Sequence, residues 1–373
     1  MRVLLLTDAD VAIRERSLLE RLAVGIADEG ARVAMASPRA VSRAESPTLI
    51  QHFGFDPPAP LLGARHQAEN FRDSLHEAGF ITDASSLDVI HVFGSNVTEL
   101  ALALGGIERC GVVVESASRA MNQDAHRIMR SIRRRGAPGP LVWTTPSAEL
   151  RDELAALAPE TECRHIPWGV HTAPAKESGD SNDDPLGVVM LVNRRLGAVG
   201  AAILEGISEA ARAIDREIIV ICDDAVARQD HRFWRTAKKL DLLSRVSLVS
   251  SLEARRDPVL NADLFISACA PGEHRSMVLD AMGHAVAIVS LDDPMIDWNH
   301  AGETGQVVRQ STPGAWAAAI QPLLRDDAER HSLGERARAW ARANRAASGH
   351  VRLTLQLYDW IAARAEGTKV EGQ

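Results

Sequence analysis

The residues best placed to do chemistry lie in residues 261–290 (NADLFISACAPGEHRSMVLDAMGHAVAIVS). The pattern predicts a strand that ends near Ala268, a Pro-Gly loop, and a helix that begins near Ser276. If the helical phase extends back to Glu273, that residue and Asp280, seven positions later, share one helix face, about 10 Å apart along the axis. This separation is too large for two carboxylates that share a proton. It suits two contacts to one extended ligand, with helix-start amides between them for an anion.

Alternating strands and helices must position this segment. Apolar strand patterns occur at residues 2–7, 32–37, 88–92, 111–115 and 141–144, and again at residues 187–192, 217–222, 246–249, 263–267 and 285–290. Continuous apolar runs separated by helical patterns, such as residues 16–29, indicate parallel sheets covered on both faces. We therefore predict an α/β fold of two doubly wound, Rossmann-like domains that face a cleft, with ligands at the carboxyl ends of the strands.

The domain boundary is predicted from a change in composition. Residues 172–185 (TAPAKESGDSNDDP) interrupt the alternation with Pro, Gly, Ser and acidic residues, which is typical of a linker. We expect one domain in residues 1–171 and a second in residues 186–345. Residues 316–324, 328–346 and 350–364 have helical apolar spacing, and we expect the helix in residues 346–373 to pack back toward the first domain.

Composition limits the classes of partner. The chain has 373 residues and a formal net charge of −8, so a general nucleic-acid binder is not indicated. The 42 basic residues include only four lysines, so we expect arginines to make any contact with an anion. The four cysteines form no C-x-x-C pair, and the sequence shows no signal peptide and no apolar run of the roughly 20 residues that a membrane span needs. These features predict a cytoplasmic protein.

The segment from Asp280 onward resembles the family-four class of retaining glycosyltransferases, which have the GT-B fold. That family has a glutamate, seven residues, and a second glutamate that opens an "EAMA.G.PVV" segment; residues 280–289 read DAMGHAVAIV. Residues 165–171 (HIPWGVH) resemble the family's "IPNGVD" turn. Further likeness follows in the same order along the chain, at residues 87–93 (LDVIHVF), 243–262, 302–308 (GETGQVV) and 323–360.

The resemblance implies an enzyme, a hexosyltransferase-like protein that moves a sugar from a nucleotide-diphosphate donor to an acceptor with retention of anomeric configuration. It places the donor in the second domain and the acceptor (a glycan, a lipid-linked or a small molecule) in the first, and it requires no metal ion or cofactor. By this resemblance Glu273 contacts the donor sugar, Asp280 contacts the ribose, and Arg194 holds the diphosphate with help from Arg195. Further donor contacts are expected at residues that align with the family's "EGFG" tetrad and with its first loop, namely His274, Arg275, Ser276 and Arg14.

The chain departs from the family pattern at several positions. Val199 occupies the lysine position of the "GR…KG" phosphate clamp, and residues 8–14 (DADVAIR) contain no glycine where the family has a Gly-Gly loop. The usual histidine after the central strand falls near Ala117. The alternative hypothesis is therefore a non-catalytic GT-B-like binding or scaffold protein that has lost the clamp, because a shared fold does not guarantee its usual chemistry. A different GT-B reaction, epimerisation or phosphorolysis, is a weaker option.

Other charged residues have simpler interpretations. Asp8 and Asp10 resemble a metal-binding D-x-D pair, but we interpret them as a loop that approaches a helix. His91 lies inside an apolar strand and is expected to be a hydrogen-bonded core residue. Several arginines share one face of a predicted helix, which favours a solvated face over a weak contact with a membrane surface; these are Arg127, Arg130, Arg133, Arg134 and Arg135.

Overall fold

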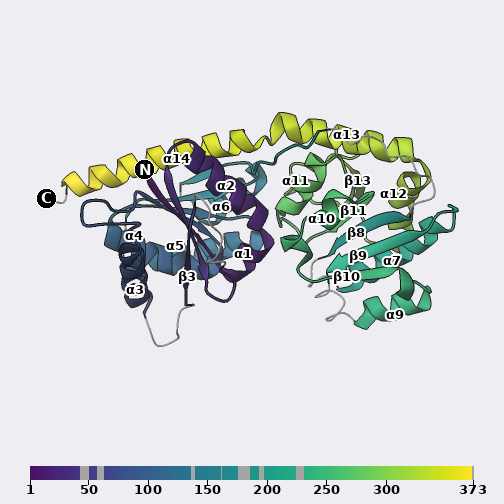
Figure 1. Cartoon of the computed structure of the whole chain (residues 1–373), viewed down its shortest axis with the longest axis horizontal. Coiled ribbons are helices and arrows are strands. Elements are labelled where there is room, and N and C mark those ends of the chain that lie inside the picture. The colour runs from purple at the N-terminus through teal and green to yellow at the C-terminus, as the bar shows by residue number, and fades with distance from the viewer. Residues whose placement is uncertain are drawn as a thin grey trace. The chain divides into compact units, whose positions relative to one another are not determined.

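The computed structural model describes residues 1–42, 50–56, 63–135, 139–160, 162–174, 185–192, 197–223 and 231–371. The chain forms two compact units, one of Met1–Gly169 with Ala347–Gln373 and the other of Val170–Ala346. Each unit contains one parallel β-sheet covered by helices (Figure 1). The predicted α/β class with two doubly wound sheets is confirmed.

The first unit contains a seven-stranded sheet in the order β3-β2-β1-β4-β5-β6-β7. The strands are β1 (Arg2–Thr7), β2 (Arg32–Pro38), β3 (Gln51–Phe55), β4 (Val89–Phe93), β5 (Gly111–Glu115), β6 (Leu141–Thr145) and β7 (Cys163–His165). Neighbouring strands run parallel throughout. The strand order reverses between β1 and β4, so the connections that leave these two strands diverge to opposite faces.

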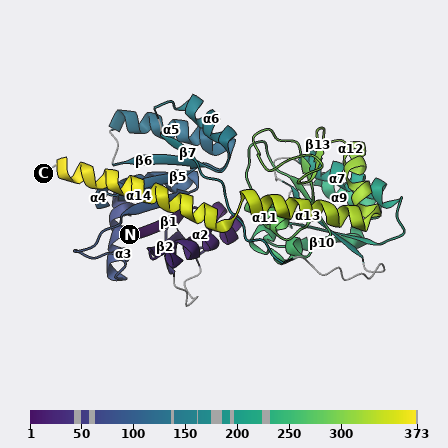
Figure 2. The ribbon, with the colours of Figure 1, turned by 90° about the horizontal axis from the view of Figure 1, so that it is seen from above.

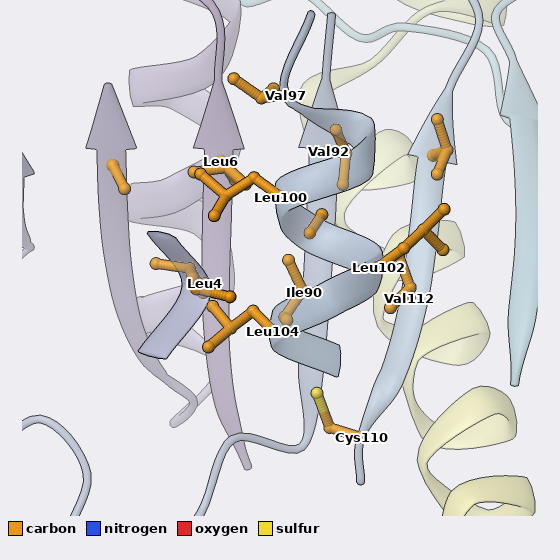
Figure 3. Close-up of a cluster of buried hydrophobic side chains, with 14 of the residues drawn as sticks. Leu4, Leu6, Ile90, Val92, Val97, Leu100, Leu102, Leu104, Cys110 and Val112 are labelled. Carbon is orange, nitrogen blue, oxygen red and sulfur yellow. The ribbon is translucent and has the colours of Figure 1, made fainter. Parts of the chain in front are cut away.

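Both faces of this sheet are buried, which explains its continuous apolar strands. Leu4 and Leu6 of β1 point into one core, where α4 (Thr98–Glu108) packs on the sheet through residues such as Leu100 (Figure 3). Val3 and Leu5 point into the opposite core. The unit's other helices are α1 (Ala9–Arg14), α2 (Arg16–Asp28), α3 (Ala64–Glu77), the 3-10 turn η1 (Ser95–Val97), α5 (Arg119–Arg135), α6 (Ala148–Leu157) and α14 (Ala347–Glu371).

Helix α14, at the end of the chain, covers the second of these cores. Figure 2 shows α14 running across the sheet beside α2. Leu357 and Ile361 of α14 are buried there together with residues of α2 and the sheet. Two glycines permit the close approach. A Cβ at Gly25 would lie 2.5 Å from Cγ2 of Val351, and one at Gly111 would lie 2.8 Å from Cγ1 of Ile361.

The second unit contains a six-stranded parallel sheet in the order β10-β9-β8-β11-β12-β13. Its strands are β8 (Leu186–Val192), β9 (Ile218–Asp223), β10 (Val246–Val249), β11 (Leu264–Ala268), β12 (Ala287–Leu291) and β13 (Gln306–Val308). The helices are α7 (Gly197–Ala211), α9 (His231–Lys239), η2 (Leu243–Arg245), η3 (Leu252–Ala254), α10 (Asp257–Leu260), α11 (Ser276–Gly283), α12 (Pro313–Arg325) and α13 (Asp327–Asn344). Strands β8 and β11 lie at the centre, so the loops that follow them are positioned by a fully buried framework.

Ten strands that the sequence predicts are present within two residues of the predicted bounds at each end. Three further strands, β3, β7 and β13, were not predicted, and neither was helix α1. Within the described part of the chain, no helix combines the length and apolar character that crossing a membrane requires.

Candidate functional site

A pocket opens in the second unit where β11 and β12 end. Its cavity volume is about 20 Å³, roughly the space that one water molecule needs. In a parallel sheet, the loops after neighbouring strands meet at the carboxyl edge, which is where ligands bind in doubly wound folds. Its wall includes the carboxylates of Glu273, Asp292 and Asp293, the polar residues Ser267, Cys269, Ser290 and Asn299, and the apolar residues Pro271, Val278, Leu291, Ile296 and Trp298.

Hydrogen bonds hold the two loops of this pocket together. Asp293 accepts hydrogen bonds from the backbone N–H of Gly272 (2.5 Å) and of Met295 (2.9 Å). Gly272 has a φ of +71°, a conformation that favours glycine. On the β12 side, Ser290 donates to Oδ1 of Asn299 (2.7 Å). The polar groups of the wall therefore have defined orientations before a ligand arrives.

Glu273 reaches the pocket from a turn and not from a helix. Its N–H donates to the carbonyl of Ala270 (3.0 Å), and Arg275 has an extended conformation (φ −135°, ψ 119°) before α11 begins at Ser276. The predicted start of the helix is confirmed. The helix does not extend back to Glu273, so the prediction that Glu273 and Asp280 share one helix face is wrong. Six residues separate the two carboxylates, one fewer than in the motif that they resemble.

The side chain of Asp280 is buried against an arginine that the sequence analysis missed. Arg256, just before α10, places Nε 3.3 Å from Oδ2 of Asp280, and its Nη2 donates to Oγ of Ser276 (2.9 Å). The exposed fractions of the Arg256 and Asp280 side chains are 10% and 5%. Every residue of α11 is buried, and an aspartate in such a helix needs a charged partner. An aspartate among the apolar residues of this helix could have indicated from the sequence that a positive side chain lies nearby. It could not indicate which arginine that is.

Arg275 joins Glu273 to a second carboxylate that the sequence analysis also missed. Nη2 of Arg275 lies 2.5 Å from Oε1 of Glu273, and Nη1 lies 3.1 Å from Oε1 of Glu253 in η3. His274, between them in sequence, is buried. The structure thus brings Glu273 and Arg275 into direct contact, and it connects Ser276 with Asp280 through Arg256.

Cys269 is the thiol in the pocket wall. Burial raises its pKa to about 11, with Glu273 and Glu253 adding to this effect and Arg275 opposing it. The thiol is therefore protonated at neutral pH, which does not suit a nucleophile. All four cysteines are free thiols.

The structure describes only part of the predicted phosphate clamp. Arg194 and Arg195 lie outside the described residues. Val199, at the position of the family's lysine, packs against the hydrophobic core of the second unit from the first turns of α7. An apolar residue is therefore the structurally consistent choice there.

In the first unit, the loop after β1 is closed by an aspartate. Oδ1 of Asp8 accepts from the N–H of Val11 (2.9 Å) and caps α1, which fits the predicted helix-approach loop. Its carboxylate lies so close to Gly94 that a Cβ there would meet Oδ2 at 2.2 Å. Burial raises the pKa of Asp8. A carboxylate thus occupies the helix-start amide that a glycine-rich loop would offer to phosphate.

Arg14, predicted to contact a phosphate from this loop, instead contacts two carboxylates. It pairs with Asp10 on the same helix and with Glu15, whose Oε1 lies 3.1 Å from Nε. Among the described residues, no cluster of His, Cys, Asp and Glu has an arrangement that could hold a metal ion.

A buried polar network lies beneath α14. His91 is 2.7 Å from the hydroxyl of Tyr358, as expected for a hydrogen-bonded core histidine, and burial lowers its pKa. Glu115 accepts from Nε1 of Trp168 (2.8 Å) and from Oγ1 of Thr144 (2.5 Å). Burial alone would raise the pKa of Glu115, but its contacts with His91, Thr144 and Trp168 prevail and lower it. Trp168, for which the sequence suggested no role, therefore anchors the end of the first unit to its sheet.

The basic helix is α5. Ile128 and Met129 are buried, whereas Arg130 is exposed and Arg127 pairs with Asp124 (2.9 Å). The side chains of Arg133, Arg134 and Arg135 lie outside the described residues. These contacts are those of a solvated helix face, and a membrane contact stays a prediction.

No protein-family model matches the sequence, and no curated protein matches it. The fold, in contrast, is similar to solved glycosyltransferase structures. Sucrose-phosphate synthase from Thermosynechococcus elongatus is 16% identical, with a TM-score of 0.71 over 97% of this chain and 100% of that one. HepE from Anabaena, in complex with UDP and glucose, is 14% identical, with a TM-score of 0.71 over 96% and 99% of the two chains. A glycosyltransferase from Rickettsia africae is 13% identical, with a TM-score of 0.67 over 96% and 98%.

These similarities confirm the GT-B fold. The low identity is that of a divergent representative of the fold.

Proposed function

We propose that this chain is a glycosyltransferase that binds a nucleotide-diphosphate sugar in its second unit and transfers the sugar to an acceptor with retention. The observation that carries the proposal is the pocket at the ends of β11 and β12, with Glu273 in its wall. The ligands of proteins with this fold support the donor class. HepE was crystallised with UDP and with UDP-glucose, and spinosyn rhamnosyltransferase with thymidine diphosphate.

The groups in the pocket wall suit a sugar ring, which the cavity of about 20 Å³ admits only if the loops after β11 and β12 move apart. Glu273, Asp293 and Asn299 offer hydrogen-bond acceptors and donors to hydroxyl groups, and Trp298 with Ile296 offers an apolar surface to a ring face. In this proposal Glu273 is the catalytic residue that contacts the donor sugar.

The reaction exchanges one bond at the anomeric carbon for another. The bond from that carbon to the diphosphate oxygen breaks while the acceptor oxygen bonds on the same face, and the acceptor proton passes to the departing diphosphate. Positive charge fixed next to the diphosphate stabilises the charge that develops on it. We assign this task to Arg194, with Arg195 and Arg275 as further contacts, so that arginines rather than a metal ion or cofactor supply the charge.

The other predicted residues keep supporting roles in the proposal. Asp280, held by Arg256, would contact the ribose. Ser276, the first residue of α11, and His274, two positions before it, would contact the diphosphate. Arg14, on the first unit, is expected to contact the donor only if it leaves Asp10 and Glu15. The acceptor would bind to the first unit. The free cysteines support a reducing, cytoplasmic location.

Thermal melting with millimolar UDP, GDP, ADP and TDP tests donor binding, because a ligand that binds only the native state stabilises it by RT ln(1 + [L]/Kd). We expect at least one nucleotide to raise the melting midpoint. Glu273→Gln should then keep nucleotide binding and lose the slow hydrolysis of the matching nucleotide sugar. If no nucleotide shifts the midpoint, the chain is a scaffold of this shape and not a transferase; if Glu273→Gln hydrolyses donor at the wild-type rate, its catalytic role is wrong.

A further inference from the structure

Arg275 is shared by two carboxylates that lie in different places. Glu273 belongs to the pocket wall. Glu253 belongs to η3 on a separate segment and, as far as the described residues define that wall, lies outside it. The guanidinium spans the two, with contacts of 2.5 Å to Glu273 and 3.1 Å to Glu253, and its side chain is only 10% exposed. Glu253 therefore helps to fix the position of a cation that pairs with the pocket carboxylate.

Five side chains that pair with one another near the pocket do not favour an anionic ligand through their own charges. Arg256 and Arg275 supply two positive charges, while Glu253, Glu273 and Asp280 supply three negative ones, so the five side chains carry a formal charge of −1. A nucleotide diphosphate that approaches Arg275 meets guanidinium N–H groups that carboxylates already occupy. Carboxylate and phosphate oxygens compete for the same planar fork of donors.

Of the three carboxylates, Glu253 has the most exposed side chain. Its side chain is 21% exposed, compared with 16% for Glu273 and 5% for Asp280. A carboxylate near solvent regains its hydration when it leaves an ion pair, whereas a buried one is left uncompensated. Glu273, moreover, is needed at the sugar in the proposed reaction.

We infer that Glu253 is an exchangeable counter-ion that holds Arg275 before the donor binds and gives it up to the diphosphate of the donor. This inference rests on the proposed function. Glu253 is then a positioning residue that sets donor affinity: it keeps Arg275 ordered, and its charge opposes the incoming diphosphate. The consequence is unusual for a residue of a binding site, because removal of its charge strengthens binding.

The test compares two variants that should change the affinity for a nucleotide diphosphate in opposite directions. Isothermal titration calorimetry measures Kd for UDP, with GDP, ADP and TDP in parallel, and for uridine, which lacks the diphosphate. Glu253→Gln keeps the size and hydrogen-bonding capacity of the side chain, and we expect it to tighten binding of the preferred diphosphate by about 3- to 10-fold and leave uridine unchanged. Arg275→Gln should weaken the diphosphate by about 10-fold or more. If that variant does not fold, Arg275→Lys replaces it. Lysine keeps the positive charge but lacks the planar pair of N–H donors, so it should weaken diphosphate binding by less than 10-fold.

A matched control separates local from overall charge. Glu335→Gln removes a carboxylate that pairs with Arg338 on α13 (2.6 Å), and we expect no change in any Kd. Unchanged or weaker diphosphate binding by Glu253→Gln, or equal tightening of uridine, would overturn the inference. Failure of the wild type to bind any of the four diphosphates would instead overturn the proposed function itself.

Discussion

The ion pair between Arg256 and Asp280 makes a quantitative prediction about stability. Both side chains are at least nine-tenths buried, and Nε and Oδ2 lie 3.3 Å apart. Arg256→Met removes the guanidinium and keeps most of the apolar volume, so the Asp280 carboxylate remains buried without that partner. Loss of one member of a buried pair costs about 3–5 kcal/mol. We expect a loss of unfolding free energy of this order.

The double variant shows whether the pair itself causes the loss. Arg256→Met with Asp280→Asn removes both charges, and we expect it to recover roughly 1–3 kcal/mol relative to the sum of the two single changes. Urea unfolding followed by tryptophan fluorescence provides the measurement, since Trp298 and Trp316 are buried in the same unit. Changes in midpoint at constant slope report stability alone.

An exposed pair supplies the control. Arg65 and Glu69 lie one turn apart on α3, with 83% and 48% of their side chains exposed. Arg65→Met should change the unfolding free energy by no more than about 0.5 kcal/mol. The reasoning is refuted if Arg256→Met costs as little as Arg65→Met, or if the double variant is no more stable than the two single effects predict.

Two further predictions concern the first unit. Burial lowers the pKa of His350 to about 4, below the value of about 6.5 of an unfolded histidine, so the unfolded state binds more protons between these pH values. The free energy of unfolding should therefore fall by up to about 3 kcal/mol as pH decreases from 6.5 to 4. Urea unfolding at several pH values should show that His350→Leu lacks this loss. The same pH profile for the variant and the wild type would contradict the prediction. Gly25→Ala places a Cβ 2.5 Å from Val351 and should destabilise the chain by about 1–3 kcal/mol. A Cβ at Gly349 on α14 meets nothing within 4 Å, so Gly349→Ala should stabilise the chain by about 0.4–1 kcal/mol. Thermal melting should show a lower midpoint for Gly25→Ala and a higher one for Gly349→Ala. Equal changes in the two midpoints would contradict this prediction.

The sequence predicted the strands well where both faces of a strand are buried. Residues 2–7 and 187–192 are nearly continuous apolar runs because their apolar side chains are buried on both faces of the sheet. Strand β3 (QHFGF) was missed because Gly54 and two polar residues interrupt its pattern. Strands β7 and β13 have three residues each, too few to show a period. Helix α1 was missed because Asp8 and Asp10 look like loop residues, although Asp8 is its cap.

The site was predictable only where position in the fold determines it. Glu273 lies after a central strand, and the loops after such strands form the carboxyl edge of a parallel sheet. The partners of the site residues, Glu253 and Arg256, lie about 20 positions away on another segment, and no periodicity relates them to Glu273 or Asp280. The same is true of Trp168 and Glu115, 53 positions apart. Such contacts depend on three-dimensional packing.

A crystal structure of this chain with its preferred nucleotide diphosphate and the matching sugar tests the central claim most directly. The account predicts the diphosphate within hydrogen-bonding distance of Arg275 near the start of α11, and the sugar in the β11–β12 pocket against Glu273. A nucleotide bound elsewhere, or a pocket that stays closed to the sugar while Arg275 keeps both carboxylates, would contradict it.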